Sequence, residues 1–389
     1  MNKLLVWVNE RLPVVNAIKN QTTNYLVPKN FNLLYVFGAL SLLVFVNQFV
    51  TGLWLTMFYI PSAQDAFDSV EYIMRDVHFG WLLRYMHTTG ASMFFIVVYI
   101  HMFRSLLYGS YQKPRELVWL IGMGLFVLLM MEAFFGYLLP WGQLSYWGAQ
   151  VITSLFSVIP GVGDTIVTWI RGDFSVSGST LGRFFALHIV AVPFLLIFLV
   201  YLHVVALHHV GANNPEGTIL KKADYIPFHP FYTLKDSVAA LTFLLVFFAI
   251  VFFLPEMGGI FIEPDNFVPA NPLQTPAEIS PVWYLAPFYS ILRAIPNKTL
   301  GVIALQASII LLFFLPWLDN NPVKSMRHKG YVARILLLLF CISFIVLGVL
   351  GKRPVTYTSQ IIARWALGFY FLYFLSLPLL ALKKRNKHA

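Results

Sequence analysis

Charged residues are scarce in this chain of 389 residues, and their scarcity excludes an ordinary soluble protein. Asp, Glu, Lys and Arg make up 11% of the chain, against about 25% in typical soluble domains. Hydrophobic residues make up 58%, and the mean hydropathy is +0.71. One water-facing core could not hide so many apolar side chains, so the sequence predicts an integral membrane protein.

Cysteine is almost absent, because Cys341 is the only one and lies in an apolar run. A single cysteine excludes an intramolecular disulfide, a cysteine-ligated iron–sulfur cluster, a zinc ribbon and a CxxCH haem attachment. Any bound metal must therefore be held by His, Met or carboxylate side chains.

Long apolar runs are present instead, and eight of them can span about 30 Å of hydrocarbon as helices. They cover residues 32–58, 80–106, 117–138, 181–207, 237–255, 299–317, 332–350 and 361–382. The expected fold is an all-α membrane protein with eight transmembrane helices. Residues 1–30 have too short an apolar run for a secretory signal and are predicted to form an amphipathic helix on the membrane surface.

The positions of the charges predict the orientation of these helices. Of the 27 Lys and Arg residues, 18 lie on the amino-terminal side of the membrane, whereas 11 of the 17 acidic residues lie on the other side. By the positive-inside rule, both termini are expected in the cytoplasm. The net charge of +10 then reflects orientation and not nucleic-acid binding. Two long outer loops, 139–180 and 256–298, are rich in Pro, Gly and aromatics, which is typical of functional loops.

Four of the ten histidines lie inside predicted membrane helices, where an unpaired polar ring costs several kcal/mol. His87 and His101 are 14 residues apart in the second helix, about 21 Å of rise and about 40° short of four turns. His188 and His203 are 15 apart in the fourth helix, about 22 Å of rise and about 60° past four turns. Both helices cross in the same direction. His87 is therefore expected to face His188 near the outer side, and His101 to face His203 near the inner side.

Two stacked pairs of imidazoles suit two six-coordinate b-type haems, although histidines that hydrogen-bond between helices are the alternative. Two glycine pairs with a spacing of 14 residues, Gly38 with Gly52 and Gly122 with Gly136, support haem because a flat macrocycle needs bare backbone nearby. Glycine is also common in membrane helices for packing alone.

Three arginines, Arg84, Arg104 and Arg183, lie three to five residues from these histidines, toward the membrane surfaces. A guanidinium there could pair with a haem propionate. Snorkelling of the side chain to the membrane interface is the alternative.

Several motifs distributed along the chain resemble the cytochrome b family, the haem-bearing core subunits of quinol:cytochrome c oxidoreductase (bc1) complexes. They include GWLLRYMHTTGAS at 80–92, HMFRSLLYGSY at 101–111, AFFGYLLPWGQLSYWGAQVIT at 133–153, HHVGANNPEG at 208–217, PVWY at 281–284 and LPWLDNNPVKS at 315–325. The resemblance places a haem-binding bundle at 32–210, an inner loop at 211–236 and the remaining helices at 237–389.

The resemblance also implies two quinone sites and further haem contacts. The quinol-oxidation site on the outer side would use Gly148, Ile152, Glu278, Pro281, Val282, Trp283, Tyr284 and Tyr289. The quinone-reduction site on the inner side would use His208, Lys235 and Asp236, and the added haem contacts would be Gln48, Ser110 and Trp119.

The activity implied by the resemblance is bifurcated oxidation of quinol. One electron would leave to a partner Rieske iron–sulfur protein, and the other would cross from a low-potential outer haem b to a high-potential inner haem b to reduce quinone. Cytochrome c1, membrane lipid and a second copy of the complex are the other implied partners, and a bacterial inner membrane is the implied location.

Two features depart from the family pattern. The usual PEWY motif has an acid that is thought to take a proton from quinol, and Val282 stands in its place. Glu278 or a water chain is then the candidate acceptor. The 15-residue spacing in the fourth helix, typical of b6-type relatives, should rotate or tilt the inner haem. Two other functions stay open: the same chemistry in a b6f-like complex, and an eight-helix proton-coupled transporter with a histidine relay.

Overall fold

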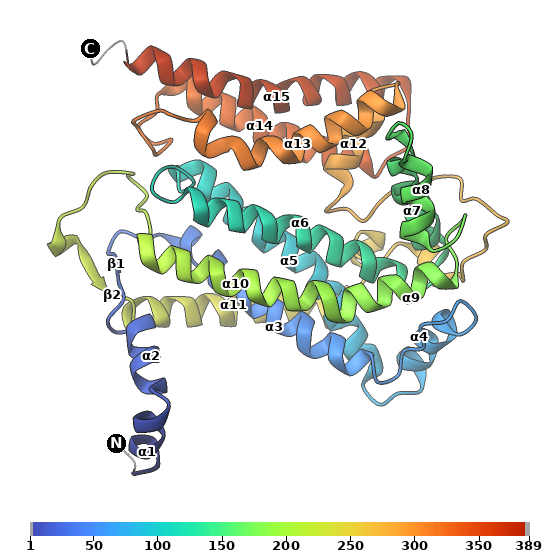
Figure 1. Ribbon diagram of the computed structural model, residues 1–389, viewed down its shortest axis with the longest axis horizontal. Coiled ribbons are helices and arrows are strands. Elements are labelled where there is room, and N and C mark those ends of the chain that lie inside the picture. Colours follow the sequence, from blue (N-terminus) through green and yellow to red (C-terminus); the bar gives the residue numbers. More distant parts are fainter. Residues whose placement is uncertain (1–2, 386–389) are drawn as a thin grey trace.

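The computed structural model describes residues 3–385 and arranges the long helices in two groups that lie side by side (Figure 1). The first group comprises α3 (Phe37–Leu55), α5 (Gly80–Tyr108), α6 (Glu116–Leu138), α9 (Gly178–Ala186), α10 (Val192–Val210) and α11 (Phe231–Phe253). The second comprises α12 (Ala286–Ala294), α13 (Lys298–Leu318), α14 (Tyr331–Gly351) and α15 (Tyr357–Arg385). The remaining α-helices and strands are α1 (Lys3–Arg11), α2 (Val14–Gln21), α4 (Ala66–Arg75), α7 (Gln143–Ser154), α8 (Gly163–Arg171), β1 (Leu26–Pro28) and β2 (Tyr225–Pro227).

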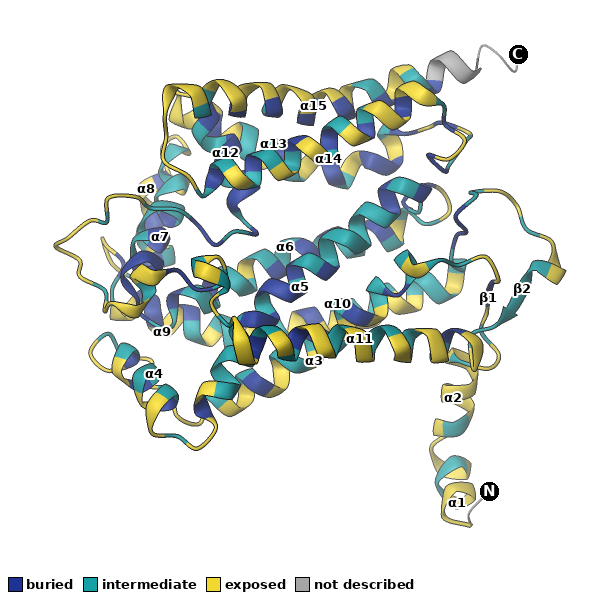
Figure 2. Cartoon of the chain, turned by 180° about the vertical axis from the view of Figure 1, so that it is seen from behind, coloured by how far each residue is buried: buried dark blue, intermediate teal, exposed yellow. Residues whose placement is uncertain are grey.

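Eight helices in the described part of the chain are long and apolar enough to cross a membrane, which confirms the predicted fold class. Their bounds fall within a few residues of the predicted stretches. Exposed residues cover the outward faces of the long helices (Figure 2), and many of them are large and apolar, such as Phe49, Leu245 and Phe253. Such side chains suit a lipid environment.

The two ends of the helix bundle carry different elements. We call them the α7 end, which holds α4, α7 and α8, and the β1 end, which holds the two short antiparallel strands, α2 and the final turns of α15 (Figure 1). The first and last described residues therefore lie toward the same end, as an even number of crossings requires. Part of the basic carboxyl-terminal tail, including Lys387, lies outside the described residues.

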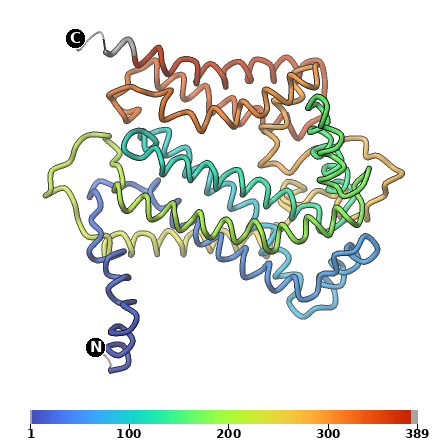
Figure 3. The backbone as a smooth tube through the Cα atoms, viewed as in Figure 1, coloured from blue at the N-terminus to red at the C-terminus, as the bar shows by residue number. Residues whose placement is uncertain are grey.

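The amino-terminal segment contains two short helices instead of the single predicted one. Helix α1 ends at Arg11 and α2 begins at Val14, because Pro13 cannot continue the backbone hydrogen bonds of a helix. The Asn9 carboxamide oxygen accepts from the Val15 backbone N–H at 3.0 Å and holds the bend. Figure 3 shows this segment leaving the β1 end crosswise to the long helices, the direction expected for a segment on a membrane surface.

Helix α11 packs on α3 and α5, although the expected division groups it with the carboxyl-terminal helices. Phe243 and Ala240 pack against Val36 and Val97, and Phe247 packs against Met93. The first group therefore contains five membrane helices.

A largely aromatic core joins the two groups of helices. The Tyr284 ring stacks on Phe95 of α5 with centroids 3.9 Å apart, and the Tyr99 hydroxyl donates to the Tyr284 carbonyl at 2.5 Å. The Trp119 indole of α6 donates to the Leu312 carbonyl of α13 at 2.7 Å. The first two contacts attach the segment 281–284 to the histidine-bearing bundle, and the third attaches α13 to it.

A π-helical turn at Leu187–Ala191 connects α9 with α10 and contains His188. The Val192 backbone N–H donates to the Leu187 carbonyl, five residues back, so the turn accommodates one extra residue. The 15-residue interval between His188 and His203 then has the angular phase of about 14 residues of regular helix. The π-helical turn therefore offsets the extra residue in this interval.

Candidate functional site

The four membrane histidines meet in the two pairs that their spacing predicts. The His87 and His188 ring centroids lie 6.2 Å apart toward the α7 end, and the His101 and His203 centroids lie 6.4 Å apart toward the β1 end. Two imidazoles that ligate one metal through bonds of about 2 Å place their centroids roughly 6 Å apart. Both pairs therefore have the separation that a bis-imidazole metal requires.

Each of the four predicted glycines faces one of these imidazoles. A Cβ at Gly38 would lie 3.3 Å from His101 Cε1, at Gly52 3.1 Å from His87 Cε1, and at Gly122 3.1 Å from His203 Cε1. The tightest case is Gly136, where a Cβ would lie 2.5 Å from His188 Cε1. The glycines thus make room for the histidine rings themselves, whereas the sequence suggested room for a macrocycle.

Two residues that the sequence did not single out hold the rings nearest the α7 end. The Thr51 hydroxyl lies 2.9 Å from His87 Nδ1 and donates to the Asn47 carbonyl at 2.6 Å. Glu132 lies beside His188 Nδ1, with its carboxylate Oε1 at 3.0 Å and its backbone carbonyl at 2.9 Å. An acid inside a predicted membrane helix, four residues before Gly136, was the available signal for Glu132, because such an acid usually has a functional partner.

A cavity of about 450 Å³ surrounds the pair of histidines at the α7 end; we call it the α7 cavity. It extends from His87 and His188 to the segment 281–284. The predicted site residues that line it are Gln48, Gly52, Arg84, His87, Gly136, His188, Val282 and Tyr284. Gln48 also donates to the His87 carbonyl at 3.0 Å, which ties α3 to α5 at the level of the ring.

The other predicted quinol-site residues surround this cavity without all lining it. Pro281 is buried, and the Trp283 indole donates to the Ser92 hydroxyl at 3.1 Å. The Tyr289 hydroxyl donates to the Ile279 carbonyl at 3.2 Å. Glu278 is exposed and is not among the residues that line the α7 cavity.

On α7, Gly148 is buried, and a Cβ there would lie 3.8 Å from Tyr137 Cε1, whereas Ile152 is half-buried one turn further on. Burial raises the pKa of Tyr284, with a smaller contribution from the Glu263 charge. Its phenol therefore stays protonated and can donate a hydrogen bond.

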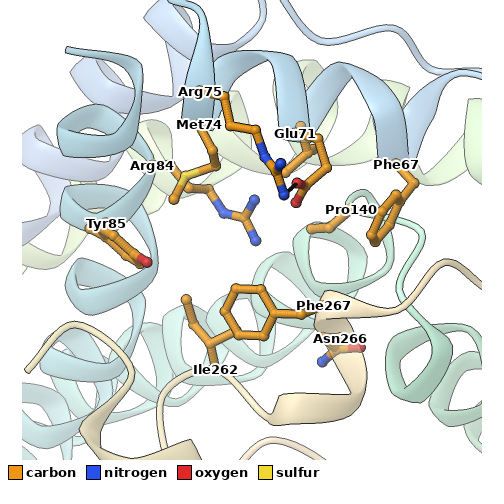
Figure 4. A pocket seen from close by; sticks show the side chains of 11 residues that line it. Phe67, Glu71, Met74, Arg75, Arg84, Tyr85, Pro140, Ile262, Asn266 and Phe267 are labelled. Carbon is orange, nitrogen blue, oxygen red and sulfur yellow. Dashed lines mark ion pairs between the residues drawn. The ribbon is translucent and has the colours of Figure 1, made fainter.

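A second cavity of about 230 Å³ adjoins the first and shares Arg84 and Asn266 with it. Figure 4 shows Arg84 of α5 pointing between Glu71 and Arg75 of α4 on one side and Phe267 on the other. Glu71 and Arg75 form an ion pair at 2.5 Å, and Arg75 is largely exposed. This cavity therefore extends from the α7 cavity toward the protein surface.

The remaining predicted haem contacts have mixed outcomes. Arg104 donates to the Ser110 hydroxyl at 3.1 Å, so these two residues do come together near the β1 end. Trp119 instead binds the α13 backbone, as described above. The Arg183 guanidinium donates to the Trp169 carbonyl of α8, and it is not among the residues that line the α7 cavity.

The three predicted quinone-reduction residues lie on α10 and α11 near the β1 end. The His208 ring stacks on Tyr25, with centroids 4.0 Å apart. The Lys235 ammonium lies 4.9 Å above the Tyr232 ring, and Asp236 is half-buried. Within residues 3–385, no hydrogen bond or ion pair joins His208 to Lys235 or Asp236, so the structure brings them to one end without direct contact.

Comparisons with known proteins fit this arrangement. Residues 22–211 match the family model Cytochrome b/b6/petB, and residues 269–371 match the model Cytochrome b(C-terminal)/b6/petD. A cytochrome b from Allochromatium vinosum is 51% identical over 98% of this chain and 96% of its own length. The chain belongs to the cytochrome b family. A Rickettsia prowazekii cytochrome b is 49% identical over 97% of this chain and 94% of its own length.

A solved structure described as a hyperthermophilic respiratory Complex III contains a chain with the same fold as this cytochrome b family member. The TM-score is 0.92, with 40% identity over 97% of this chain and 98% of that chain. The resemblance to the cytochrome b family that the motifs predicted is confirmed. The chain is the core subunit of a quinol:cytochrome c oxidoreductase, haem binding follows from the family, and the transporter alternative is not supported.

Proposed function

We propose that this chain carries two non-covalent b haems, one at each histidine pair, and catalyses quinol oxidation at the α7 end and quinone reduction at the β1 end. The observation that carries the proposal is the equal separation of two imidazole pairs, 6.2 and 6.4 Å between centroids, at two depths of one bundle. His87 and His188 hold one haem iron, and His101 and His203 hold the other. The low-potential haem is assigned to the α7 end and the high-potential haem to the β1 end.

The residues around both pairs fit haem. Four glycines keep side chains away from the imidazoles, and Thr51 and Glu132 orient two of the rings through Nδ1, which leaves each Nε2 for a metal. Arg104 and Ser110 lie at one level and Arg84 at the other, where guanidinium groups could bind propionates. Bound haem supplies a one-electron redox centre at each level.

The α7 cavity is the proposed quinol site. Val282 and Tyr284 line it with apolar and aromatic surface, as a quinone ring requires, and the Tyr284 phenol is a donor for a ring oxygen. Gly148 and Ile152 on α7, with Pro281, Trp283 and Tyr289, support these walls. At the β1 end, His208, Lys235 and Asp236 are the proposed groups for binding and protonating quinone.

The α7 end is proposed to face the outside of a bacterial inner membrane, with both termini in the cytoplasm. Most basic residues lie toward the β1 end, which supports this orientation through the positive-inside rule. A partner iron–sulfur protein is required, because one cysteine cannot ligate such a cluster. A Rieske protein, cytochrome c1, membrane lipid and a second copy of the complex are the proposed partners.

The test is a haem count on the complex purified in mild detergent, followed by a redox titration of the reduced-minus-oxidised spectrum. We expect two non-covalent b haems per chain with separable midpoint potentials. Replacing His203 by Leu should remove one haem and leave the other, and replacing His87 by Leu should remove the complementary one.

One control separates ligand loss from general unfolding. His229 lies outside the membrane helices, and its ring contacts the Thr233 hydroxyl at 3.3 Å, so His229→Leu should retain both haems. A wild-type complex without b haem would contradict the proposal. Equal haem loss in all the His→Leu variants would contradict the ligand assignment.

A further inference from the structure

Val282 leaves the quinol site without the acid that stands at this motif position in the family pattern, so a proton acceptor must come from elsewhere. Two acids line the α7 cavity, Glu132 and Glu263. Glu132 lies beside His188 Nδ1, whereas Glu263 is joined to the segment 281–284 through Lys352, which contacts both. The Glu263 side chain comes from the loop after α11 and is buried, with 5% of the residue exposed. Glu278, the candidate from the sequence, is exposed and does not line the cavity.

Both carboxylate oxygens of Glu263 have partners. Oε1 accepts from the Lys352 ammonium of α14 at 2.8 Å. Oε2 accepts from the Tyr137 hydroxyl of α6 at 3.1 Å and from the Asn266 amide at 3.2 Å. A buried carboxylate is retained only with such compensation, so the site is built to hold this group at the cavity wall.

Lys352 connects the carboxylate to the motif segment. Its ammonium also donates to the Ser280 hydroxyl at 3.0 Å and to the Pro281 carbonyl at 3.1 Å, directly before Val282. When Glu263 is ionised, the ammonium balances its charge. When Glu263 becomes neutral, the two other acceptors keep the ammonium hydrogen-bonded, so the protein tolerates both states of the carboxyl group.

A path for the proton to leave is also present. Asn266, which donates to Glu263, lines both the α7 cavity and the second cavity. That second cavity extends to the half-buried Glu71 and the exposed Arg75 on α4 (Figure 4). Only Asn266 therefore separates a proton held by Glu263 from the second cavity, which extends toward the surface.

From this geometry we infer that Glu263 accepts a proton from quinol, in place of the acid missing at Val282; the inference rests on the proposed quinol site. The O–H bond of one quinol hydroxyl breaks, its electron pair stays on the quinol oxygen, and the proton forms an O–H bond with the carboxylate. The other hydroxyl gives its proton to solvent. One electron passes to the partner iron–sulfur protein and then to cytochrome c, and the other passes through the two proposed haems to quinone at the β1 end. Quinone is the product.

The test uses the intact complex and measures quinol:cytochrome c reductase activity against pH. The titratable groups that face Glu263 are Lys352, Tyr137 and Tyr284. The carboxylate can accept a proton and the neutral carboxyl group cannot, so the wild-type rate should have an acidic limb. E263Q should lower the maximal rate by about 10²-fold and remove this acidic limb. D265N, which changes an exposed acid two residues away, is the matched control.

A rescue distinguishes proton transfer from a structural role. Adding V282E to E263Q returns a carboxyl group to the same cavity wall and should restore at least a tenth of the wild-type rate. E263Q with full haem content and a wild-type pH profile would overturn the inference, as would loss of the acidic limb in E278Q instead. An assembled double variant without rescue would also overturn it.

If E263Q does not assemble, infrared difference spectra of the wild-type and E263D complexes test the inference instead. A carboxyl C=O band that appears with quinol oxidation and shifts in E263D supports the inference, whereas a band unmoved in E263D overturns it. Failure of the proposed function is a separate result. A haem-replete wild-type complex that oxidises no quinol would refute the quinol site, whereas normal wild-type activity with an unaffected E263Q refutes only the role of Glu263.

Discussion

Replacement of Gly136 by alanine is expected to prevent binding of the haem proposed at the α7 end, in a chain that still folds. The new Cβ would lie 2.5 Å from His188 Cε1, whereas ordinary contacts begin at 3.4 Å. The ring must therefore retreat by about 0.9 Å, while a metal–ligand bond tolerates about 0.2 Å. Retreat is also opposed by the contact between Glu132 and His188 Nδ1. At an unobstructed helix position, Gly→Ala stabilises the helix by roughly 0.5–1 kcal/mol. Any loss of stability or of haem in Gly136→Ala therefore comes from displacement of the His188 ring.

The other three glycines provide a graded series. The same arithmetic requires displacements of about 0.3 Å for Gly52→Ala and Gly122→Ala and about 0.1 Å for Gly38→Ala, because their Cβ contacts would be 3.1, 3.1 and 3.3 Å. Haem retention should therefore be lowest in Gly136→Ala, intermediate in Gly52→Ala and Gly122→Ala, and highest in Gly38→Ala. Gly124→Ala is the matched control on α6, since its Cβ would make an ordinary 3.7 Å contact with Leu199.

The assay is the number of b haems per chain in the purified complex, measured together with its thermal unfolding midpoint. Gly136→Ala should retain one haem, with the spectrum of the β1-end site, while Gly124→Ala retains both. Two haems in Gly136→Ala would refute the steric argument. Equal loss in Gly124→Ala would show that α6 tolerates no added methyl group, whatever it faces.

Three other predictions concern single polar contacts. Thr51→Val removes the hydroxyl beside His87 Nδ1 and should weaken retention of the haem proposed at the α7 end by about 10–100-fold, measured as haem release in detergent. Thr242→Val, at an exposed position on α11 outside the α7 cavity, is the control. Glu132→Gln removes the carboxylate beside the proposed ligand His188. A negative charge there favours oxidised haem, so the midpoint potential of the haem proposed at the α7 end should rise by about 60 mV per 1.4 kcal/mol lost. An unchanged redox titration would contradict this prediction. Asp319→Asn removes the carboxylate that neutralises a buried ammonium and should cost about 3–5 kcal/mol of stability, seen as a lower unfolding midpoint.

The histidine pairs could be predicted from the sequence because the depths of the two histidines in each helix depend only on their spacing along that helix. The rise and rotation per residue place His87 above His101, and the crossing direction of the helices then determines which rings meet. The glycines follow the same periodicity, so their level was predictable, although their actual neighbours, the imidazole rings, were not.

The π-helical turn at Leu187–Ala191 was not predictable from the interval of 15 residues alone. A regular helix converts one added residue into a rotation of about 100°. The hydrogen bond from the Val192 N–H to the Leu187 carbonyl, five residues back, accommodates that residue beside His188, and the two pairs keep almost equal separations. Which local distortion absorbs an extra residue depends on packing, and periodicity carries no information about it.

The polar wall of the α7 cavity lay beyond the sequence for a different reason. Its groups come from α6 (Tyr137), from the loop that carries Glu263 and Val282, and from α14 (Lys352), and tertiary contacts alone bring them together. Proximity in sequence favoured Glu278, four residues before Val282, yet the loop turns that side chain outward and brings in an acid 19 residues away. An acid lost from a motif is therefore best sought among the residues that the fold places on the same cavity wall, where burial and an ion pair distinguish Glu263 from its exposed neighbours.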